Sequence, residues 1–306
     1  MCIRDSINVK DKVIEFETGN VLIGSVSRLY MSNKCLLIAD HKSVDKQIHI
    51  FNKNDFSYLT SIGNFGEGPE EITVMGCLAI DEAHHQLYVS DHAKQKIFSY
   101  DMDSVMVDSL YKPQVKTAMN ETLFPSEYQY INDTLSIAVL IKPTSTSTFN
   151  QFLGRWNMNT GEMIPMKYTH PDIQKKRITF AASEKAGIYV ECYTRHDLMT
   201  ICSLDGELLY NIYGPDWDGG NGNKLQSFGT VMIGNDKIFV SYCGEDYARD
   251  SFPTKILVFD LEGNYLKTLE TGYKISDCCY DSFNNRIILS LNDVVQFAYL
   301  DIDGII

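Results

Sequence analysis

The chain has 306 residues, with 40 acidic and 27 basic side chains and a formal net charge of −13. Apolar residues make up 44% and charged residues 22%, which is a globular composition and excludes disordered and fibrous classes. No apolar run approaches the roughly 18 residues that a membrane helix needs. The excess of acid argues against nucleic acid as a partner, because phosphate contacts require clustered Lys and Arg.

The first residues, Met1-Cys2-Ile3-Arg4-Asp5-Ser6, contain neither a basic nor an apolar region of a signal peptide. They read like the translation of a sequencing-adapter end, and a genuine cytoplasmic N-terminus is the alternative. We therefore expect residues 1–11 to be a non-native or disordered lead. The single domain that we predict for residues 1–306 begins, in effect, with an alternating strand at residues 12–16.

An apolar strand then recurs every 49–52 residues along the chain. Its six copies lie at residues 37–40, 88–91, 137–140, 189–192, 239–242 and 288–291. A second set of strands follows each copy and ends in Asn-, Asp- or Gly-containing turns, such as Asp205-Gly206 and Glu262-Gly263. These residues favour tight hairpins, and the intervening segments are β-branched and aromatic. The pattern predicts an all-β chain with strands about every 8–12 residues.

Six copies of a four-stranded antiparallel unit of about 50 residues predict a six-bladed β-propeller. The last copy supplies only three strands, at residues 276–280, 286–291 and 295–300. We expect residues 12–16 to pair with this last blade and close the ring. The alternative is that the chain is clipped at its C-terminus and the fourth strand is absent.

The segment Gly63-Asn64-Phe65-Gly66-Glu67-Gly68-Pro69-Glu70-Glu71 carries a G-x-x-G-x-G-P-x-E motif. It resembles the NHL-type repeat and, more closely, the TolB-like six-bladed propellers typified by bacterial lipoproteins. The resemblance implies a non-enzymatic binding protein in the periplasm or cell envelope, and it supplies no catalytic residues. From the residues themselves, the glycines and Pro69 indicate a turn between blades rather than a phosphate-binding loop.

The connections between blades are predicted to be long on one face of the propeller, at residues 62–74, 112–127, 142–150, 213–226 and 243–255. Because function concentrates on loops held by a rigid scaffold, we expect the ligand site on this face and at the mouth of the central channel. Strand ends, exposed aromatic residues and corresponding places in the innermost strands of blades one and three give eight candidate ligand-binding residues: Arg28, Glu67, Tyr128, Arg195, His196, Trp217, Tyr242 and Tyr247. Arg28 and Tyr128 are the two on innermost strands, where a charged residue would line the channel or pair with a carboxylate. At the same strand ends, Asp40 and Asp91 are expected to cap the following loops.

A transition-metal site, a calcium site and a hydrolase are the three chemical alternatives to a binding role. Asp-His pairs at residues 40–41, 91–92 and 196–197 could ligate a transition metal, but they are spread around the ring. Residues 216–223 resemble a calcium loop but fail the EF-hand pattern. The inner strands offer Ser126, Glu127 and Asp277 to a calcium-dependent, lactonase-like hydrolase, but no ordered nucleophile set.

The sequence therefore favours a non-catalytic binding propeller without metal or cofactor. We expect a monomer that binds a protein, peptide or glycan, does not bind nucleic acid and does not span a membrane. The metal-dependent hydrolase is the alternative. The eight cysteines include no Cys-x-x-Cys, and most are expected to be buried in strands without disulfides.

Overall fold

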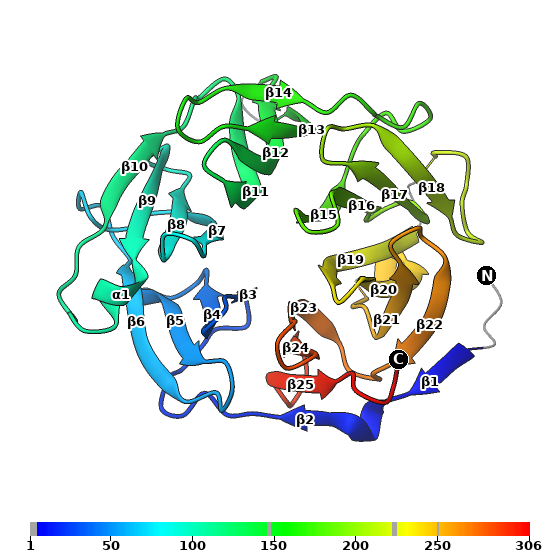
Figure 1. The fold of residues 1–306 in the computed structure, drawn as a ribbon, viewed down its shortest axis with the longest axis horizontal. Coiled ribbons are helices and arrows are strands. Elements are labelled where there is room, and N and C mark those ends of the chain that lie inside the picture. Colours follow the sequence, from blue (N-terminus) through cyan, green and yellow to red (C-terminus); the bar gives the residue numbers. More distant parts are fainter. Residues whose placement is uncertain (1–4, 146–147, 222–224, 250) are drawn as a thin grey trace. The chain divides into compact units, whose positions relative to one another are not determined.

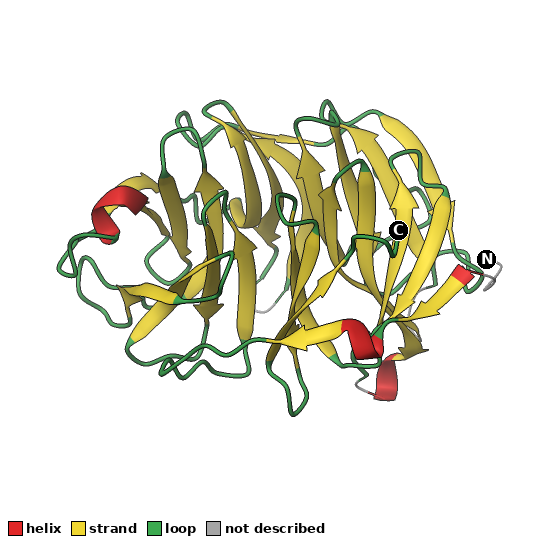
Figure 2. Ribbon diagram, turned by 60° about the horizontal axis from the view of Figure 1, so that its bottom comes forward, coloured by secondary structure: helices red, strands yellow, loops and turns green. Residues whose placement is uncertain are grey.

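The computed structural model describes residues 5–145, 148–221, 225–249 and 251–306. Strands dominate these residues (Figure 2). The helices among them are short: η2 (Lys10–Lys12), α1 (Met102–Val105) and η3 (Tyr247–Arg249). The chain divides into two compact units, a continuous unit of residues 17–166 and a discontinuous unit of residues 1–16 with 167–306.

The continuous unit contains three four-stranded antiparallel sheets (Figure 1). The first consists of β3 (Ser27–Met31), β4 (Cys35–Asp40), β5 (Lys46–Asn52) and β6 (Tyr58–Asn64). The second consists of β7 (Met75–Asp81), β8 (Gln86–Asp91), β9 (Lys96–Asp101) and β10 (Gln114–Ala118). The third consists of β11 (Phe124–Asn132), β12 (Leu135–Pro143), β13 (Phe149–Trp156) and β14 (Met163–Pro165).

The discontinuous unit contains the other three sheets. One consists of β15 (Ile178–Ser183), β16 (Ile188–Tyr193), β17 (Leu198–Ser203) and β18 (Leu208–Tyr213). The next consists of β19 (Leu225–Gly234), β20 (Lys237–Asp246), β21 (Lys255–Asp260) and β22 (Tyr265–Glu270), with β1 (Ser6–Asn8) added at its edge. The last consists of β23 (Ile275–Asp281), β24 (Arg286–Leu291), β25 (Phe297–Asp301) and β2 (Val13–Glu15). The fold is thus an all-β six-bladed propeller of four-stranded antiparallel blades, as predicted.

The N-terminal segment takes part in two blades. Strand β2 pairs antiparallel with β25 through Val13 and Leu300, which confirms the predicted pairing of residues 12–16 with the last blade. Strand β1 pairs parallel with β22, and Val9 beyond it is fully buried. The expectation of a disordered lead is therefore wrong from Ser6 onward, because backbone pairing and the burial of Val9 hold this segment in place.

The core lies between neighbouring sheets. Leu37 and Ile48 of the first blade pack in one buried cluster with Leu78 and Val89 of the second. Each sheet thereby buries apolar side chains that it could not cover alone. The seven cysteines of the described residues are all buried and unpaired, as predicted; Cys2 lies outside those residues.

One predicted loop contains a strand. Residues 112–127 were expected to connect two blades, but β10 (Gln114–Ala118) forms within them as the outer strand of the second blade. Its sequence, Gln-Val-Lys-Thr-Ala, is largely exposed and lacks the apolar alternation that marks a half-buried strand. Among the described residues, no helix is long and apolar enough to cross a membrane.

Candidate functional site

The turn after β16 organises the loop after β18. Asp197 is almost fully buried and accepts hydrogen bonds from the Asp216 amide at 3.0 Å and the Tyr242 hydroxyl at 3.4 Å. Its backbone carbonyl accepts from the Gly214 amide at 2.8 Å. A Cβ at Gly214 would overlap the Asp197 carboxylate, so glycine is required for this close approach. The two segments are therefore fixed to each other.

This anchoring brings together a group that we call the aromatic–histidine site: His170, His196, Tyr213, Trp217 and Asp218. The indole of Trp217 contacts both imidazoles, with ring centroids 5.3 Å from His170 and 6.0 Å from His196. Tyr213 lies 5.1 Å from Trp217 and is about half exposed. The result is a partly exposed aromatic surface held by two buried histidines.

The tautomer of His170 follows from its neighbours. The Asp172 amide donates to its Nδ1 at 3.3 Å, so the proton of the neutral ring lies on Nε2. Nε2 then donates to the Tyr213 hydroxyl at 3.0 Å. Burial holds the pKa of His170 below its usual range, so the ring is neutral at pH 7. His170 thus supports both aromatic side chains of the site.

The imidazole of His196 is the unsatisfied group of the site. The residue is only 6% exposed, and its buried Nδ1 has no hydrogen-bond partner. The nearest charged atom is Oδ1 of Asp218, 3.9 Å away, which is too far for a direct hydrogen bond. Burial lowers the pKa of His196 and outweighs the opposing effect of Asp218. A buried polar atom without a partner carries an energetic cost that a bound group can remove.

A buried ion pair lies beside the site. Nζ of Lys176 is 2.7 Å from the Glu191 carboxylate, and both side chains are over nine-tenths buried. The Tyr193 hydroxyl donates to the same carboxylate at 3.1 Å, and the Tyr193 ring contacts that of His196 at 6.0 Å. The ion pair therefore helps to position the histidine.

Five of the eight candidate residues come together in this region: Arg195, His196, Trp217, Tyr242 and Tyr247. The guanidinium of Arg195 lies 3.7 Å from the ring centroid of Tyr247. One face of that ring is thereby covered by this cation–π contact. Tyr242 binds Asp197, and its pKa is raised by burial and then by that carboxylate. Arg195 and Tyr242 thus hold neighbouring parts of the site.

Two candidates lie on inner strands of the continuous unit. Arg28 of β3 binds Glu127 of β11, with 2.8 Å between Nη1 and Oε1, so it pairs with a carboxylate as anticipated. Tyr128 is buried against Trp156, with ring centroids 5.1 Å apart, so its side chain is not exposed to a ligand. The register of β11 shifts between Pro125 and Glu127, which turns Glu127 outward and Tyr128 into the core. The expectation for Tyr128 was therefore wrong.

Glu67 is exposed in the Gly-rich segment, whose conformation has a structural cause. The Glu71 carboxylate folds back to accept from the Gly68 amide at 2.8 Å, and a Cβ at Gly66 would overlap it. Nζ of Lys94 donates to the carbonyls of Gly68 and Glu71, both at 2.6 Å. The motif is thus a loop folded around a lysine, in agreement with the predicted turn between blades.

The aspartates of the first two blades have the capping role that was expected as the alternative to ligand binding. Asp40 accepts from the amides of Gly24 and Lys42 at 2.7 and 3.0 Å. Asp91 accepts from the amides of Thr73 and Ala93 at 2.8 and 3.0 Å. The predicted calcium-like segment, residues 216–223, lies partly outside the described residues.

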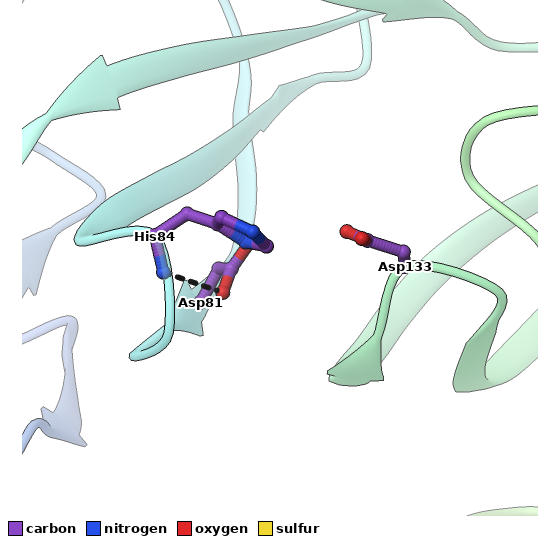
Figure 3. A group of neighbouring side chains, drawn as sticks. All are labelled: Asp81, His84 and Asp133. Carbon is purple, nitrogen blue, oxygen red and sulfur yellow. Dashed lines mark hydrogen bonds and ion pairs between the residues drawn. The ribbon is translucent and has the colours of Figure 1, made fainter.

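One group of described residues could hold a metal ion: Asp81, His84 and Asp133 (Figure 3). Their ligand atoms lie within 4.8 Å of one another, on the turns after β7 and β11. Nδ1 of His84 is 2.8 Å from Asp81, and the Tyr130 hydroxyl donates to Asp133 at 2.7 Å. Asp81 and then Asp133 raise the pKa of His84, so both carboxylates favour the protonated form of this imidazole.

We expect the Asp81–His84 pair to stabilise the fold in a pH-dependent manner. The folded pKa of His84 is raised, so its contribution is complete below about pH 6.5 and is lost as pH rises through the folded value. His84→Asn should therefore lower the melting temperature at pH 6 and have less effect at pH 9. His85→Asn, next to it, is the control, because His85 contacts the exposed Asp103 instead. Equal losses for His84→Asn at both pH values would refute the assignment.

Sequence reasoning missed His170 and assigned Asp218 only to a calcium-like loop. His170 lies in the connection between β14 and β15, which joins two blades and forms no strand. No local signal relates it to Trp217, 47 positions further along in the printed sequence. Their contact depends on the anchoring of the β18 loop by Asp197.

Comparisons with known proteins agree on the fold. A model of the DUF5128 family, described as a 6-bladed beta-propeller, matches residues 4–152, just under half of the chain. A search of curated proteins finds no match.

Three solved structures illustrate the similarity. One is from Bacteroides fragilis NCTC 9343 and is named as a candidate exported protein (14% identity, 92% of this chain and 85% of that chain, TM-score 0.59). Another is a DUF4221 family member from Bacteroides vulgatus (10% identity, 94% of this chain and 94% of that chain, TM-score 0.59). The third is the Cps50 (Swd1) β-propeller domain from Myceliophteria thermophila (9% identity, 92% of this chain and 98% of that chain, TM-score 0.57). At these identities the likeness concerns the fold alone.

Proposed function

We propose that this protein is a non-catalytic binding protein whose ligand contacts the aromatic–histidine site. The observation that carries the proposal is the contact of the partly exposed Trp217 ring with two buried imidazoles and with the half-exposed Tyr213. A partly exposed aromatic surface with a few fixed polar groups is typical of ligand sites. Because the side chains are held before binding, little ordering entropy would be lost.

The inner-strand carboxylates favour binding over the hydrolase alternative. Glu127 pairs with Arg28 at 2.8 Å, and Asp277 accepts from the Thr230 hydroxyl at 2.7 Å. Both groups are thus engaged with neighbouring side chains. A calcium-dependent hydrolase would need such carboxylates to converge on one ion.

We further propose an extracytoplasmic location, in the periplasm or cell envelope, and a monomeric state. The location is supported by the resemblance of the Gly-rich motif to TolB-like lipoproteins. The similar fold from Bacteroides fragilis, named as a candidate exported protein, points in the same direction.

The binding role is tested with a Tyr213→Ala, Trp217→Ala double variant. Wild-type protein should bind at least one member of a combined glycan array and peptide library, and the double variant should lose that binding while its circular dichroism spectrum still shows the folded β structure. Tyr210→Ala is the matched control, since Tyr210 lies on the same strand and is similarly exposed. If wild type and double variant bind equally, the site has no role in binding.

A further inference from the structure

The outer strand of the fifth blade, β22, carries an added strand at its free edge (Figure 1). Strand β1 lies parallel to it, with Ile7 opposite Leu269 and Asn8 opposite Glu270. The Val9 amide extends the pairing by donating to the Glu270 carbonyl at 3.0 Å. The backbone groups of Glu270 therefore point away from the blade, where an extended segment can pair with them.

The outer strand of the fourth blade, β18, has the same backbone geometry at its end. In the fifth blade the Thr271 amide, just after β22, donates inward to the Thr254 carbonyl at 3.1 Å. In the fourth blade the Gly214 amide, just after β18, donates inward to the Asp197 carbonyl at 2.8 Å. Backbone groups alternate in direction along a strand of an antiparallel sheet, so the amide and carbonyl of Tyr213 point outward.

The edge of β18 has no added strand. Within the described parts of the chain, β17 is the one segment that forms backbone hydrogen bonds with β18. Tyr168 and His170 contact Asn211 and Tyr213 through side chains, at 2.7 and 3.0 Å, and so leave the backbone groups of the strand unoccupied. The strand reads Leu-Leu-Tyr-Asn-Ile-Tyr and carries no charge. Such an edge is a template for another strand.

The remaining outer strands have features that hinder the addition of a strand. At the end of β6 the Asn64 carbonyl already accepts from the Ile72 amide at 2.8 Å. Strand β14 ends in Pro165, which has no amide hydrogen, and β10 carries the exposed Lys116 where its register shifts. Strand β2 has three residues and ends in the exposed Glu15. Charge, proline and covering segments all protect edges, and β18 has none of them.

We infer that an extended peptide segment of another protein adds to β18 as a parallel strand beside Asn211–Tyr213, as β1 adds to β22. This inference rests on the proposed binding function and adds the class of ligand. Hydrogen bonds to the outward backbone groups of Asn211 and Tyr213 hold the peptide. Its side chain next to Tyr213 lies on the face of the strand that holds His170 and Trp217, and so contacts the aromatic–histidine site.

The pairing of β1 also indicates which side chains the peptide carries. Ile7, opposite Leu269, packs against the apolar core of its blade. Ile212 is the corresponding residue of β18 and also packs against a core cluster, so an apolar side chain fits beside it. The neighbouring side chains of the peptide point to the opposite face, towards Asn211 and Tyr213. The net charge of −13 disfavours an acidic peptide.

The test begins with selection of linear dodecapeptides from a phage-displayed library on the whole chain. At least one synthetic peptide from this selection should bind with a dissociation constant of about 100 µM or below in calorimetry. In the complex, hydrogen exchange of the Asn211 and Tyr213 amides should slow about 10-fold or more, because both become hydrogen-bonded. The exposed Ala118 amide of β10 is the control and should keep its exchange rate.

A pair of variants isolates the backbone contact. Tyr213→Pro removes the outward amide, as Pro165 does in β14, and breaks no backbone hydrogen bond between β17 and β18. Tyr213→Ala is the matched control, because it removes the same ring and keeps the amide. Tyr213→Pro should bind the peptide about 3- to 10-fold more weakly than Tyr213→Ala, as expected for one hydrogen bond. Circular dichroism checks that both variants fold, and the exchange measurement on wild-type protein decides the question if Tyr213→Pro does not.

Strand addition is wrong if no peptide is selected, if the bound peptide leaves exchange at Asn211 and Tyr213 unchanged, or if folded Tyr213→Pro and Tyr213→Ala bind it equally. A dimer in light scattering that dissociates on Tyr213→Pro would also overturn it, since a second copy would then occupy the edge. In each case, binding of a glycan or peptide that is lost in the Tyr213→Ala, Trp217→Ala variant would still support the proposed binding function. If neither the glycan array nor the library yields a ligand, both proposals are refuted.

Discussion

Replacement of Lys176 by Met is expected to lower the free energy of unfolding by about 3–5 kcal/mol. The ammonium of Lys176 lies 2.7 Å from the Glu191 carboxylate, and both groups are shielded from water. Removal of the lysine leaves the charge of Glu191 inside the fourth blade with only a neutral donor described beside it, the Tyr193 hydroxyl. Urea titration followed by circular dichroism measures the loss.

The companion variants separate charge burial from loss of volume. Lys176→Met combined with Glu191→Met should recover most of the lost stability, because well-packed apolar side chains often replace a buried ion pair at little cost. Lys167→Met is the exposed control: its partner Glu207 is accessible to solvent, so the change should cost less than about 1 kcal/mol. A double variant as unstable as Lys176→Met alone would contradict this explanation.

Replacement of Lys94 by Met is expected to cost about 3 kcal/mol, since two short charge-assisted hydrogen bonds contribute roughly 1.5–3 kcal/mol each. Its Nζ holds the carbonyls of Gly68 and Glu71, which would otherwise lack this donor. The Gly-rich loop should then open. Limited proteolysis with cleavage mapped to residues 63–72, together with urea titration, measures both consequences.

Lys112→Met provides a control on the same loop. Lys112 pairs with Glu70 at 2.8 Å, but both side chains are substantially exposed, so a change of less than about 1 kcal/mol is expected. If Lys94→Met leaves the loop resistant to protease, the ammonium does not hold it.

Much of the fold could be predicted because its determinants are local and repeated. Each blade carries a buried second strand, exemplified by β4 and β16, in which all six residues are buried. The two strands that were missed give weak local signals: β1 has three residues, and β10 is exposed along most of its length. Both are outer strands, and each pairs with one strand of its blade: β1 with β22 and β10 with β9.

The candidate site was harder to predict because its determinants are tertiary. Arg195 and His196 could be selected because they follow a strand end, but the contact of His196 with Trp217 depends on one buried aspartate, Asp197. The error at Tyr128 has a similar origin, since the register of β11 shifts just before this residue and its ring packs on Trp156. Periodicity alone carries no information on such a shift.

The pairing of β2 with β25 has a consequence for folding during synthesis on the ribosome. Residues 17–166 contain all the strands of their three sheets, so this unit can assemble while the rest of the chain is still being made. The last sheet must wait, because its outer strand β2 precedes this unit in the chain and its partner β25 follows it. Until then the β2 segment remains an unpaired edge, and the nascent protein would benefit from a chaperone that shields it.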